Sequence, residues 1–486
     1  MSSHNKLLPV IVALVAYIIL LYGINLPFAG QHDWNSVMYS NIARNDLRYG
    51  LLATKLGMAT NFGQLLPGEK LGFFTHYPPL MPLLLAGSFS VFGITEWAAR
   101  LIPIISAVIL VYFTFKLVQS IWDTTTALIT SVFLTLSPIL LYYSKIPVHE
   151  TVVLGFIGFT LWAYFTKRYR LVIIGLILSQ LTSWAGYYLS LYLPLHSLLF
   201  SRLPRRKLVL LFFIAPFMFL LHNLHVYWLS GSEAQQSLWE VFLFRLNANP
   251  AAQAYGMTLG KFIAREAGWI SLYFTRIMTL LSSLWALRFF YHRSRYLPIS
   301  FSESIILLLL IFGFTHNLIF RHLAYIHDYM LIYALPFFAI SSAVMLLHFY
   351  AFMRRSTPYA PALIFLILVL FSVERLSYVQ KLFQTGKVNP AVPLGKDLAA
   401  HTQPSARIAI TSVEFMRYYD VFVSYYADRR IAAATSIKPE DLVNFDYLVI
   451  PKIHDLVTPQ GKQKLFQAYT YVDTPAGLIF NLHQTP

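Results

Sequence analysis

Within the first 380 residues of this sequence, histidine stands directly before an acidic residue at three places: His32-Asp33, His149-Glu150 and His327-Asp328. A carboxylate in a partly dry cleft can act as a general base, and an imidazole can bind a metal or contact an anion. Repeated acid–histidine pairs in a chain with few charged residues therefore indicate a site for proton removal and for binding of negative charge.

Further polar side chains add to the chemistry that these pairs offer. They are Arg44, His76, Tyr77, Arg100 and Arg321. A guanidinium can pair with a phosphate group. His76 and Glu150 are the residue types that would hold a divalent metal, although the sequence leaves open whether a metal is required.

Each candidate also has a plainer explanation. An acid that follows a membrane helix, such as Asp33, is commonly just solvated. The two prolines after Tyr77 suit a helix start because their φ is fixed and they lack an N–H. Glu150 would be stabilised by a helix dipole, and Arg321 would reach from a helix end to the interface. These explanations cover the residues singly but not the repetition of the pairs.

Composition identifies the scaffold as a membrane protein. Of the 486 residues, 57% are hydrophobic and 12% are charged, whereas ordinary soluble domains carry about 25% charged residues. The absence of cysteine excludes disulfides, thiolate catalysis and Cys-type zinc sites. The net charge of +16 comes from short Lys/Arg clusters between apolar runs, so it reports membrane topology rather than nucleic-acid binding.

Apolar runs that are candidates for membrane crossings recur along the first 380 residues. They cover residues 7–28, 101–121, 125–143, 151–165, 171–200, 208–229, 269–290, 305–320, 329–350 and 361–373. Residues 171–200 lie between two basic clusters, so we expect them to cross twice, with Gly186 marking the turn of a short helical pair or a re-entrant hairpin. The total is about 11 crossings, and the expected fold is an α-helical polytopic membrane protein.

The basic clusters give the orientation. They lie at residues 167–170, 202–207, 288–295 and 354–355. Cytoplasmic loops are enriched in Lys and Arg, so these clusters and the N-terminus are expected in the cytoplasm and the C-terminus outside. Residues 78–92 are apolar but too short to span, and we expect them to form an interfacial or re-entrant helix within a long outer loop, residues 29–100.

This orientation brings every candidate residue to outer loops or outer helix ends, together with His322. Such a face suits chemistry on a phosphorylated lipid carrier, whose tail would lie between helices and whose phosphate would meet basic groups. A base would activate the acceptor, and a cation or metal would stabilise the leaving phosphate.

The last hundred residues differ in character. From about residue 380 the apolar runs stop, and residues 407–411 and 447–450 have the pattern of short buried strands. Residues 414–419 and 438–443 have helical patterns. We therefore expect a transmembrane domain, residues 1–380, and a small extracytoplasmic α/β domain, residues 381–486.

Four stretches carry a resemblance to a known family: GQHDWNSVMYSNIARNDLRYG at 30–50, HYPPL at 76–80, FGITEWAARLIP at 92–103 and the His-Asp-Tyr that ends at Tyr329. In this order they resemble GT-C superfamily glycosyltransferases, in the group of protein O-mannosyltransferases and lipid A aminoarabinose transferases (similar to glycosyltransferase family 39). They cover most of the first hundred residues and one late helix.

The resemblance implies inverting sugar transfer from a polyprenyl-phosphate donor to an envelope glycan, lipid or protein at the outer face of a plasma (inner) membrane. It implies that Asp33 is the base and that Glu150 is the second acidic residue. It assigns His76 and Arg100 to the surroundings of the donor or acceptor. The family often has Asp-Glu after the first helix, whereas Trp34 follows Asp33 here, which puts in doubt a second carboxylate and a metal site at that point.

Two other functions fit part of the pattern. A transporter or flippase of a lipid-linked sugar would explain Arg276 within an apolar run, but such proteins carry internal repeats and midplane polar residues, and the sequence shows no repeat. A non-catalytic assembly subunit would not need the acid–histidine pairs.

Overall fold

The computed structural model describes residues 4–201, 203–385, 389–453 and 455–485. The chain divides into two compact units. The helical unit comprises Met1–Ile24, Thr75–Leu84 and Arg100–Lys381, and the mixed unit comprises Asn25–Phe74, Leu85–Ala99 and Leu382–Pro486. The break at Lys381 lies beside the boundary expected at residue 380, and most of the first loop is grouped with the chain beyond that break.

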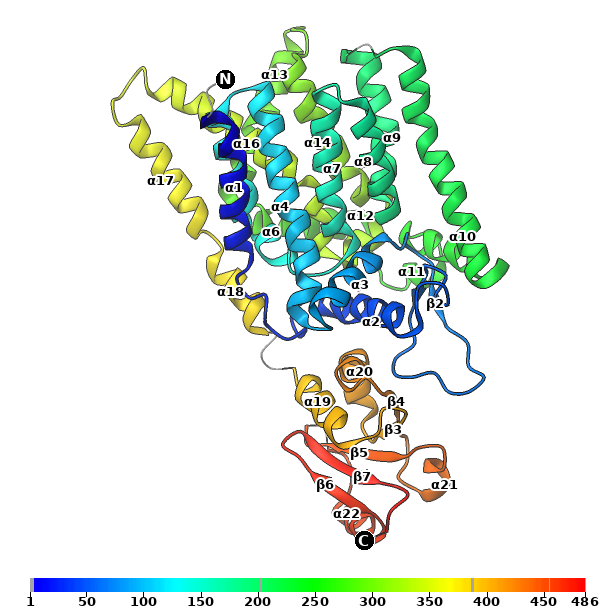
Figure 1. Ribbon diagram of the computed structural model, residues 1–486. Helices are drawn as coiled ribbons and strands as arrows, with labels where there is room; N and C mark the ends of the chain where they lie inside the picture. Colours follow the sequence, from blue (N-terminus) through cyan, green and yellow to red (C-terminus); the bar gives the residue numbers. More distant parts are fainter. Residues whose placement is uncertain (1–3, 202, 386–388, 454, 486) are drawn as a thin grey trace. The chain divides into compact units, whose positions relative to one another are not determined.

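The helical unit is built from long apolar helices (Figure 1). Its elements are α1 (His4–Leu20), α5 (Thr124–Leu136), α6 (Pro138–Tyr143), α7 (His149–Phe165), α8 (Tyr169–Thr182), α9 (Ala185–His196), η1 (Ser197–Ser201), α10 (Arg205–Arg245), α11 (Pro250–Gln253), α12 (Leu259–Tyr273), α13 (Thr275–Ser294), α14 (Phe301–Ile319), α15 (Arg321–Ile326), η2 (Asp328–Ala334), α16 (Leu335–Met353), α17 (Ala360–Val373) and α18 (Leu376–Thr385). Two more helices, α3 (Leu80–Phe92) and α4 (Glu96–Ile121), have residues in both units.

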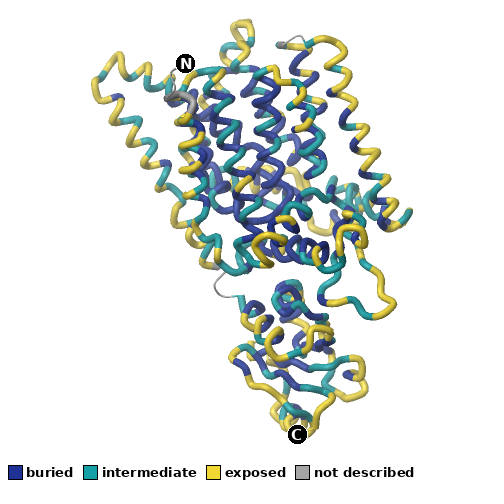
Figure 2. Tube along the Cα trace, viewed as in Figure 1, coloured by how far each residue is buried: buried dark blue, intermediate teal, exposed yellow. Residues whose placement is uncertain are grey.

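Five stretches among the described residues are long and apolar enough to cross a membrane. They are Glu96–Ile121, Arg205–Gln253, Phe301–Ile319, Asp328–Met353 and Ala360–Gln384, and the bent pair α12–α13 would be a sixth. Several shorter apolar helices, such as α3, fall below that length. The expected number of about 11 crossings therefore stays a prediction. Figure 2 shows the buried residues concentrated in the central helices, whereas α10 and α17 are largely exposed and would need lipid around them.

Two helix breaks of the helical unit lie within or at the end of apolar runs. Residues 171–200, which were expected to cross twice, form two helices, α8 and α9, with a break at Ser183 and Trp184, and the double crossing itself stays a prediction. Gly186 lies so close to α8 that an added Cβ would be 2.4 Å from the Ser179 carbonyl carbon, so only glycine fits there. A second break divides α10 at Ser230 and Gly231, where the apolar run 208–229 ends.

The mixed unit contains strands as well as helices. Its elements are α2 (Asp33–Tyr49), β1 (Met58–Ala59), β2 (Phe73–Phe74), α19 (Ala391–His401), β3 (Arg407–Ile410), α20 (Val413–Ala427), β4 (Arg430–Ala433), α21 (Pro439–Leu442), β5 (Tyr447–Pro451), α22 (Pro459–Ala468), β6 (Thr470–Asp473) and β7 (Gly477–Asn481). The strands β3 and β5 coincide with the two strands expected from sequence, and α20 and α21 include the two expected helices.

The five-stranded sheet has the order β4-β3-β5-β7-β6. Strands β3, β4 and β5 are parallel, and β7 is antiparallel to both β5 and β6. Leu448 of β5 pairs with Phe480 of β7, and both are fully buried. Around them an apolar cluster with Ala409 and Leu465 forms the core that this part of the chain needs to fold.

Candidate functional site

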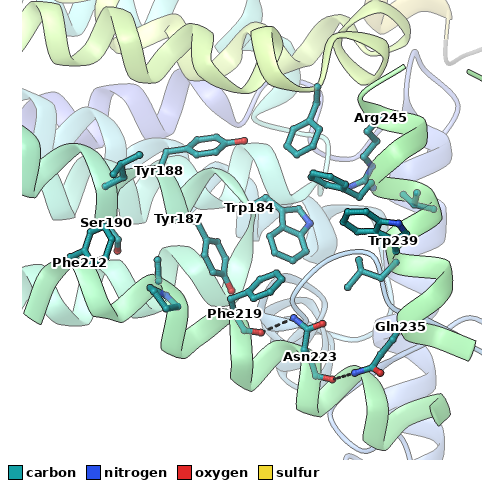
Figure 3. A pocket seen from close by; sticks show the side chains of 17 residues that line it. Trp184, Tyr187, Tyr188, Ser190, Phe212, Phe219, Asn223, Gln235, Trp239 and Arg245 are labelled. Atoms are coloured by element: carbon teal, nitrogen blue, oxygen red, sulfur yellow. Dashed lines mark hydrogen bonds between the residues drawn. The ribbon is translucent and has the colours of Figure 1, made fainter. Parts of the chain in front are cut away.

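An apolar pocket of about 570 Å³ lies in the helical unit (Figure 3). Aromatic residues of α9 and the segment before it form one wall, including Trp184, Tyr187 and Tyr188. The other wall comes from both halves of α10. Of the residues placed around the pocket, Arg245 is the one that carries a charge. A long apolar chain with an anionic end matches this lining.

The pocket depends on the break in α10. Gly231 has φ 70° and ψ −159°, a conformation that is essentially limited to glycine. Residues from Phe212 to Asn223 before the break and from Gln235 to Arg245 after it line the same pocket. The Gln235 side chain donates to the Asn223 carbonyl across the break, at 3.4 Å. A continuous straight helix would not present both stretches to one cavity.

Arg245 lines the pocket and also contacts a buried polar cluster. Its guanidinium carbon lies 4.8 Å from the centre of the Tyr77 ring. Tyr77 in turn stacks on His149, with 4.4 Å between centroids and 9° between planes. The Tyr77 hydroxyl donates to Glu150 Oε1 at 2.9 Å. Tyr77 thus brings together three residues selected from sequence, itself, His149 and Glu150, and Arg245 lies beside them.

His149 and Glu150 are held by the start of α7. His149 Nδ1 lies 2.7 Å from the carbonyl oxygen of Thr182, so that nitrogen carries the proton and donates it. The ring is fully buried, and Glu150 is 3% exposed. The helix start therefore holds an imidazole and a carboxylate side by side, away from water.

His76 borders the same cluster. Its backbone carbonyl accepts a hydrogen bond from the Trp184 indole at 2.8 Å, which connects it to the pocket wall. Its Nε2 lies 3.3 Å from the Ser237 hydroxyl. Burial, together with the nearby Arg245 guanidinium, lowers the pKa of His76 to about 4. The imidazole is therefore neutral near pH 7 and contributes no positive charge to anion binding.

Asp328 lies at a second buried cluster in the helical unit. Tyr143 donates to its Oδ1 at 2.9 Å, and Tyr273 donates to its Oδ2. Tyr378 extends this cluster through a 3.4 Å contact with Tyr273. These bonds fix the first residue of η2, and His327 packs against Tyr329 beside it. The arrangement favours a role in holding η2.

The remaining candidates of the helical unit make other contacts. Arg100 is buried and donates to the Ile24 carbonyl at 3.1 Å, at the end of the first apolar run. His322 is buried between the rings of Phe244 and Tyr255. Arg321 is exposed, which agrees with the interfacial explanation.

Arg276 differs from expectation. It lies within the apolar run 269–290, where a buried arginine would need a partner. The side chain is exposed, and the contact at this position is a hydrogen bond from its backbone N–H to Glu374. The feature that favoured a transporter is thereby weakened.

Asp33 belongs to the mixed unit, where it begins α2. Its Oδ2 accepts hydrogen bonds from the backbone of Ala29 and Gly30, at 2.9 and 2.8 Å. Its Oδ1 accepts from the Ser36 hydroxyl at 2.7 Å. His32, immediately before it, has φ 63°, a left-handed conformation that is uncommon for a side chain of this size. The carboxylate is thus held in one orientation by its own loop.

Arg44 also belongs to the mixed unit, and its guanidinium is engaged there. It lies 3.2 Å from the Asp428 carboxylate and stacks over the Tyr425 ring at 4.3 Å. The structure therefore places two candidates from the first loop, Asp33 and Arg44, in the mixed unit, and Tyr77 and Glu150 in the helical unit.

The candidate metal ligands do not meet in the part of the chain that the structure describes. Among the described residues, no three histidine or acidic side chains lie close enough to one another to hold an ion. His76 and Glu150, the two metal candidates, each have a protein partner in Ser237 and Tyr77.

Arg245 is the functional candidate that sequence reasoning missed. The apolar run that precedes it ends at residue 229, so residues 230–250 looked like a connection. A signal was present, because Arg245 is the single charge in the apolar stretch VFLFRL at residues 241–246. A lone ionisable residue in such a stretch is a candidate for function.

Known proteins resemble this chain in part of its sequence and in its fold. A family model of dolichyl-phosphate-mannose-protein mannosyltransferases matches residues 76–228, less than half of the chain. ArnT from Cupriavidus metallidurans, solved with undecaprenyl phosphate, superimposes with a TM-score of 0.58 at 13% identity, over 99% of this chain and 98% of that one. An oligosaccharyltransferase from Archaeoglobus fulgidus superimposes with a TM-score of 0.56 at 12% identity, over 99% and 75% of the two chains. No curated protein sequence matches the chain.

Proposed function

The chain has the fold of GT-C glycosyltransferases of the protein O-mannosyltransferase and aminoarabinose transferase type, as the sequence resemblance predicted, and on that premise we propose that it transfers a sugar from a polyprenyl-phosphate donor. The acceptor is an envelope glycan, lipid or protein at the outer face of the plasma (inner) membrane. The reaction is a single displacement that inverts the anomeric carbon.

The observation that carries the proposal is Arg245 at the pocket. The aromatic and aliphatic walls suit an isoprenoid chain, and the guanidinium suits the phosphate that ends it. Because Arg245 also lies on the Tyr77 ring, the phosphate would be bound next to the cluster of Tyr77, His149 and Glu150. ArnT from C. metallidurans binds undecaprenyl phosphate, a lipid of the same class.

The proposed reaction balances with these groups. The acceptor hydroxyl oxygen bonds to the anomeric carbon while the bond from that carbon to the phosphate oxygen breaks. The electron pair stays on the phosphate, where Arg245 stabilises the charge, and the acceptor proton passes to a carboxylate base. Asp33 is our candidate for the base, from the resemblance and from the way its loop fixes the carboxylate. Glu150 fixes the Tyr77 hydroxyl and is the second acidic residue.

Release of polyprenyl phosphate tests the proposal. Purified protein would be given a polyprenyl-phosphate sugar and envelope lipid, glycan or protein acceptors, and the lipid phosphate would be quantified. We expect release by the wild type and none by Asp33→Asn. Asp441→Asn, an exposed acid on α21, serves as the matched control and should retain full activity.

Two outcomes would change the assignment. Full activity of Asp33→Asn would remove Asp33 as the base. Saturable binding of the donor without release by the wild type, but with movement of the lipid between vesicle leaflets, would favour a flippase.

The membrane orientation is part of the proposal. In the described part of the chain, five helices, or six with the bent pair, have the length and composition to cross a membrane. We propose a multi-pass protein with a cytoplasmic N-terminus and an extracytoplasmic mixed unit. A reporter fused to the C-terminus should be accessible from outside intact cells, and a cytoplasmic signal would contradict the orientation.

A further inference from the structure

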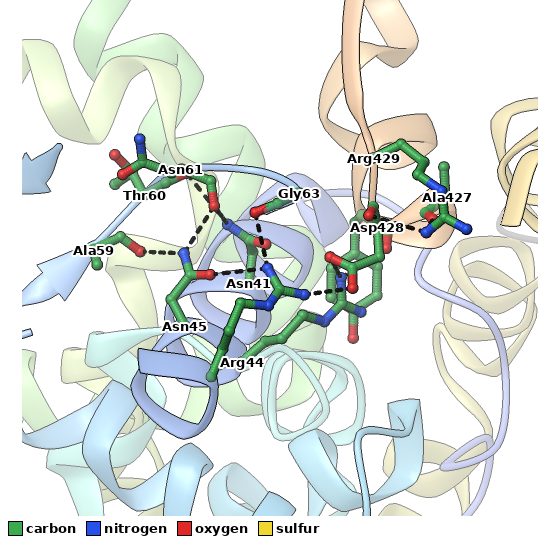
Figure 4. Close-up of polar contacts among 12 residues, drawn as sticks. Asn41, Arg44, Asn45, Ala59, Thr60, Asn61, Gly63, Ala427, Asp428 and Arg429 are labelled. Atoms are coloured by element: carbon green, nitrogen blue, oxygen red, sulfur yellow. Dashed lines mark hydrogen bonds and ion pairs between the residues drawn. The ribbon is translucent and has the colours of Figure 1, made fainter. Parts of the chain in front are cut away.

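The end of α20 contacts the first loop within the mixed unit (Figure 4). The Arg44 guanidinium donates to the Tyr425 carbonyl at 2.9 Å and lies 3.2 Å from the Asp428 carboxylate. Arg48, one turn further along α2, pairs with the same carboxylate. One acid at the end of α20 thus holds two arginines of the helix that Asp33 begins.

At this contact, the backbone that ends α20 has a left-handed conformation and packs closely against the first loop. Asp428 has φ 51°, in the left-handed region, where it ends α20. Gly63 of the first loop packs directly on the next peptide, because an added Cβ would lie 2.8 Å from the Arg429 carbonyl carbon. The Gly63 carbonyl also accepts from Arg48 at 2.9 Å. Loop and helix end therefore fit each other at backbone level.

Tyr426 makes a second connection to the loop. Its hydroxyl accepts the backbone N–H of Phe28 at 2.7 Å and donates to Glu96 Oε1 at 2.9 Å. The ring of the neighbouring Tyr425 lies 5.8 Å from the Phe28 ring. Phe28 is thus held both through its peptide and through its side chain.

This connection continues to Asp33 through consecutive residues. The N–H groups of Ala29 and Gly30, which follow Phe28, are the ones that bind the Asp33 carboxylate. His32 keeps its left-handed φ of 63° between them and α2. A shift of Phe28 would therefore move the two N–H groups that orient the Asp33 carboxylate. A shift of α2 would move the Cα of Asp33.

We propose that Tyr426 and Asp428 are positioning residues for Asp33. Tyr426 fixes the turn before the carboxylate, and Asp428 fixes the helix after it. The C-terminal part of the chain then contributes to the reaction through the geometry of the base. This inference rests on the proposed role of Asp33 as the base.

The test separates rate from binding. Displacement of a reacting group by about 1 Å can cost on the order of 100-fold in rate. We expect Tyr426→Phe, which keeps the ring and loses both hydroxyl bonds, to lower kcat by about 10- to 100-fold with an unchanged donor KM and a similar Tm. Tyr418→Phe, an exposed tyrosine on the same helix, is the matched control and should behave as the wild type.

A second variant covers the case in which Tyr426→Phe does not fold. Asp428→Asn removes the charge that pairs with Arg44 and Arg48, and it should give the same loss of kcat at constant KM, whereas Asp428→Glu should recover part of the rate. A folded Tyr426→Phe or Asp428→Asn protein with wild-type kcat would overturn the positioning role. A wild type that releases no polyprenyl phosphate would instead refute the proposed function itself.

Discussion

The Tyr77 ring lies parallel to the His149 ring, with 4.4 Å between their centroids, and its hydroxyl donates to the residue after that histidine. Two short motifs, HYPP and HE, therefore form one structure although more than 70 residues separate them. The Arg245 guanidinium carbon lies 4.8 Å from the centre of the same tyrosine ring. Changes at these positions should separate the contribution of the ring from that of the hydroxyl.

Tyr77→Phe keeps the ring and removes the donor to Glu150. A buried carboxylate that loses such a donor costs about 1–3 kcal/mol, so we expect a lower Tm and about tenfold slower release of polyprenyl phosphate. Tyr359→Phe, at an exposed position, is the control. Wild-type Tm and rate in Tyr77→Phe would show that the hydrogen bond to Glu150 has no role.

Arg245→Lys keeps the charge and loses the planar group. Lysine cannot stack on Tyr77 in the same way or bind a phosphate with two parallel donors, so we expect the donor KM to rise by about tenfold or more. Arg276→Lys, at an exposed position on α13, should leave KM unchanged. Equal losses of affinity for polyprenyl phosphate and for the uncharged polyprenol would mean that Arg245 shapes the pocket without binding phosphate.

Gly231→Ala tests the break in α10. No neighbouring atom lies within 4 Å of the added Cβ, so the cost comes from the backbone conformation alone, about 1–3 kcal/mol. We expect a lower Tm and a higher donor KM, since both halves of α10 line the pocket. Gly268→Ala within α12 also meets no atom and has an ordinary helical backbone, so it should be neutral or stabilising. Identical Tm values for the two variants would show that the break does not depend on glycine.

Asp46→Asn tests a buried acid in α2. Burial raises the pKa of Asp46 from 3.8 to about 6, only partly offset by a hydrogen bond from Thr54. The folded protein therefore holds a proton at pH values where the unfolded chain has lost it, and this group lowers the free energy of unfolding as the pH rises from about 4 to 6. Two pKa units correspond to about 3 kcal/mol above that range.

Asparagine does not titrate, so the variant should be more stable than the wild type at pH 7.5 and similar at pH 4. Thermal unfolding at both pH values measures this difference. A stability gain of equal size at pH 4 and pH 7.5 would mean that the charge of Asp46 is not its cause.

Sequence patterns predicted the structural features that depend on residues close together in the chain. Local hydropathy and turn residues predicted strands β3 and β5 and the helical pair α8–α9. They also predicted the end of the apolar run before Gly231. Tyr77 and Glu150 were identified by residue type, but their hydrogen bond depends on how α7 packs against the segment before α3. The contact of Asp428 with Arg44 joins residues almost 400 positions apart in the chain, and a local sequence pattern cannot predict a contact between such distant residues.

Arg245 escaped prediction for a different reason. Its importance comes from a backbone turn at Gly231, fourteen residues earlier, that directs the second half of α10 along the pocket. Hydropathy detects the end of an apolar run but not the direction in which the chain continues. The pocket therefore became visible only with the three-dimensional course of α10.

The break in α10 also limits which insertions and deletions this part of the protein can accept during evolution. A straight helix of 41 residues would be about 60 Å long, roughly twice the hydrocarbon thickness of a membrane. The second half of α10 contributes to the pocket wall together with the first half. A single inserted or deleted residue after Gly231 would therefore rotate Arg245 by about 100° around the helix axis. Related sequences should therefore tolerate many apolar substitutions between these two residues while keeping the number of residues between them constant.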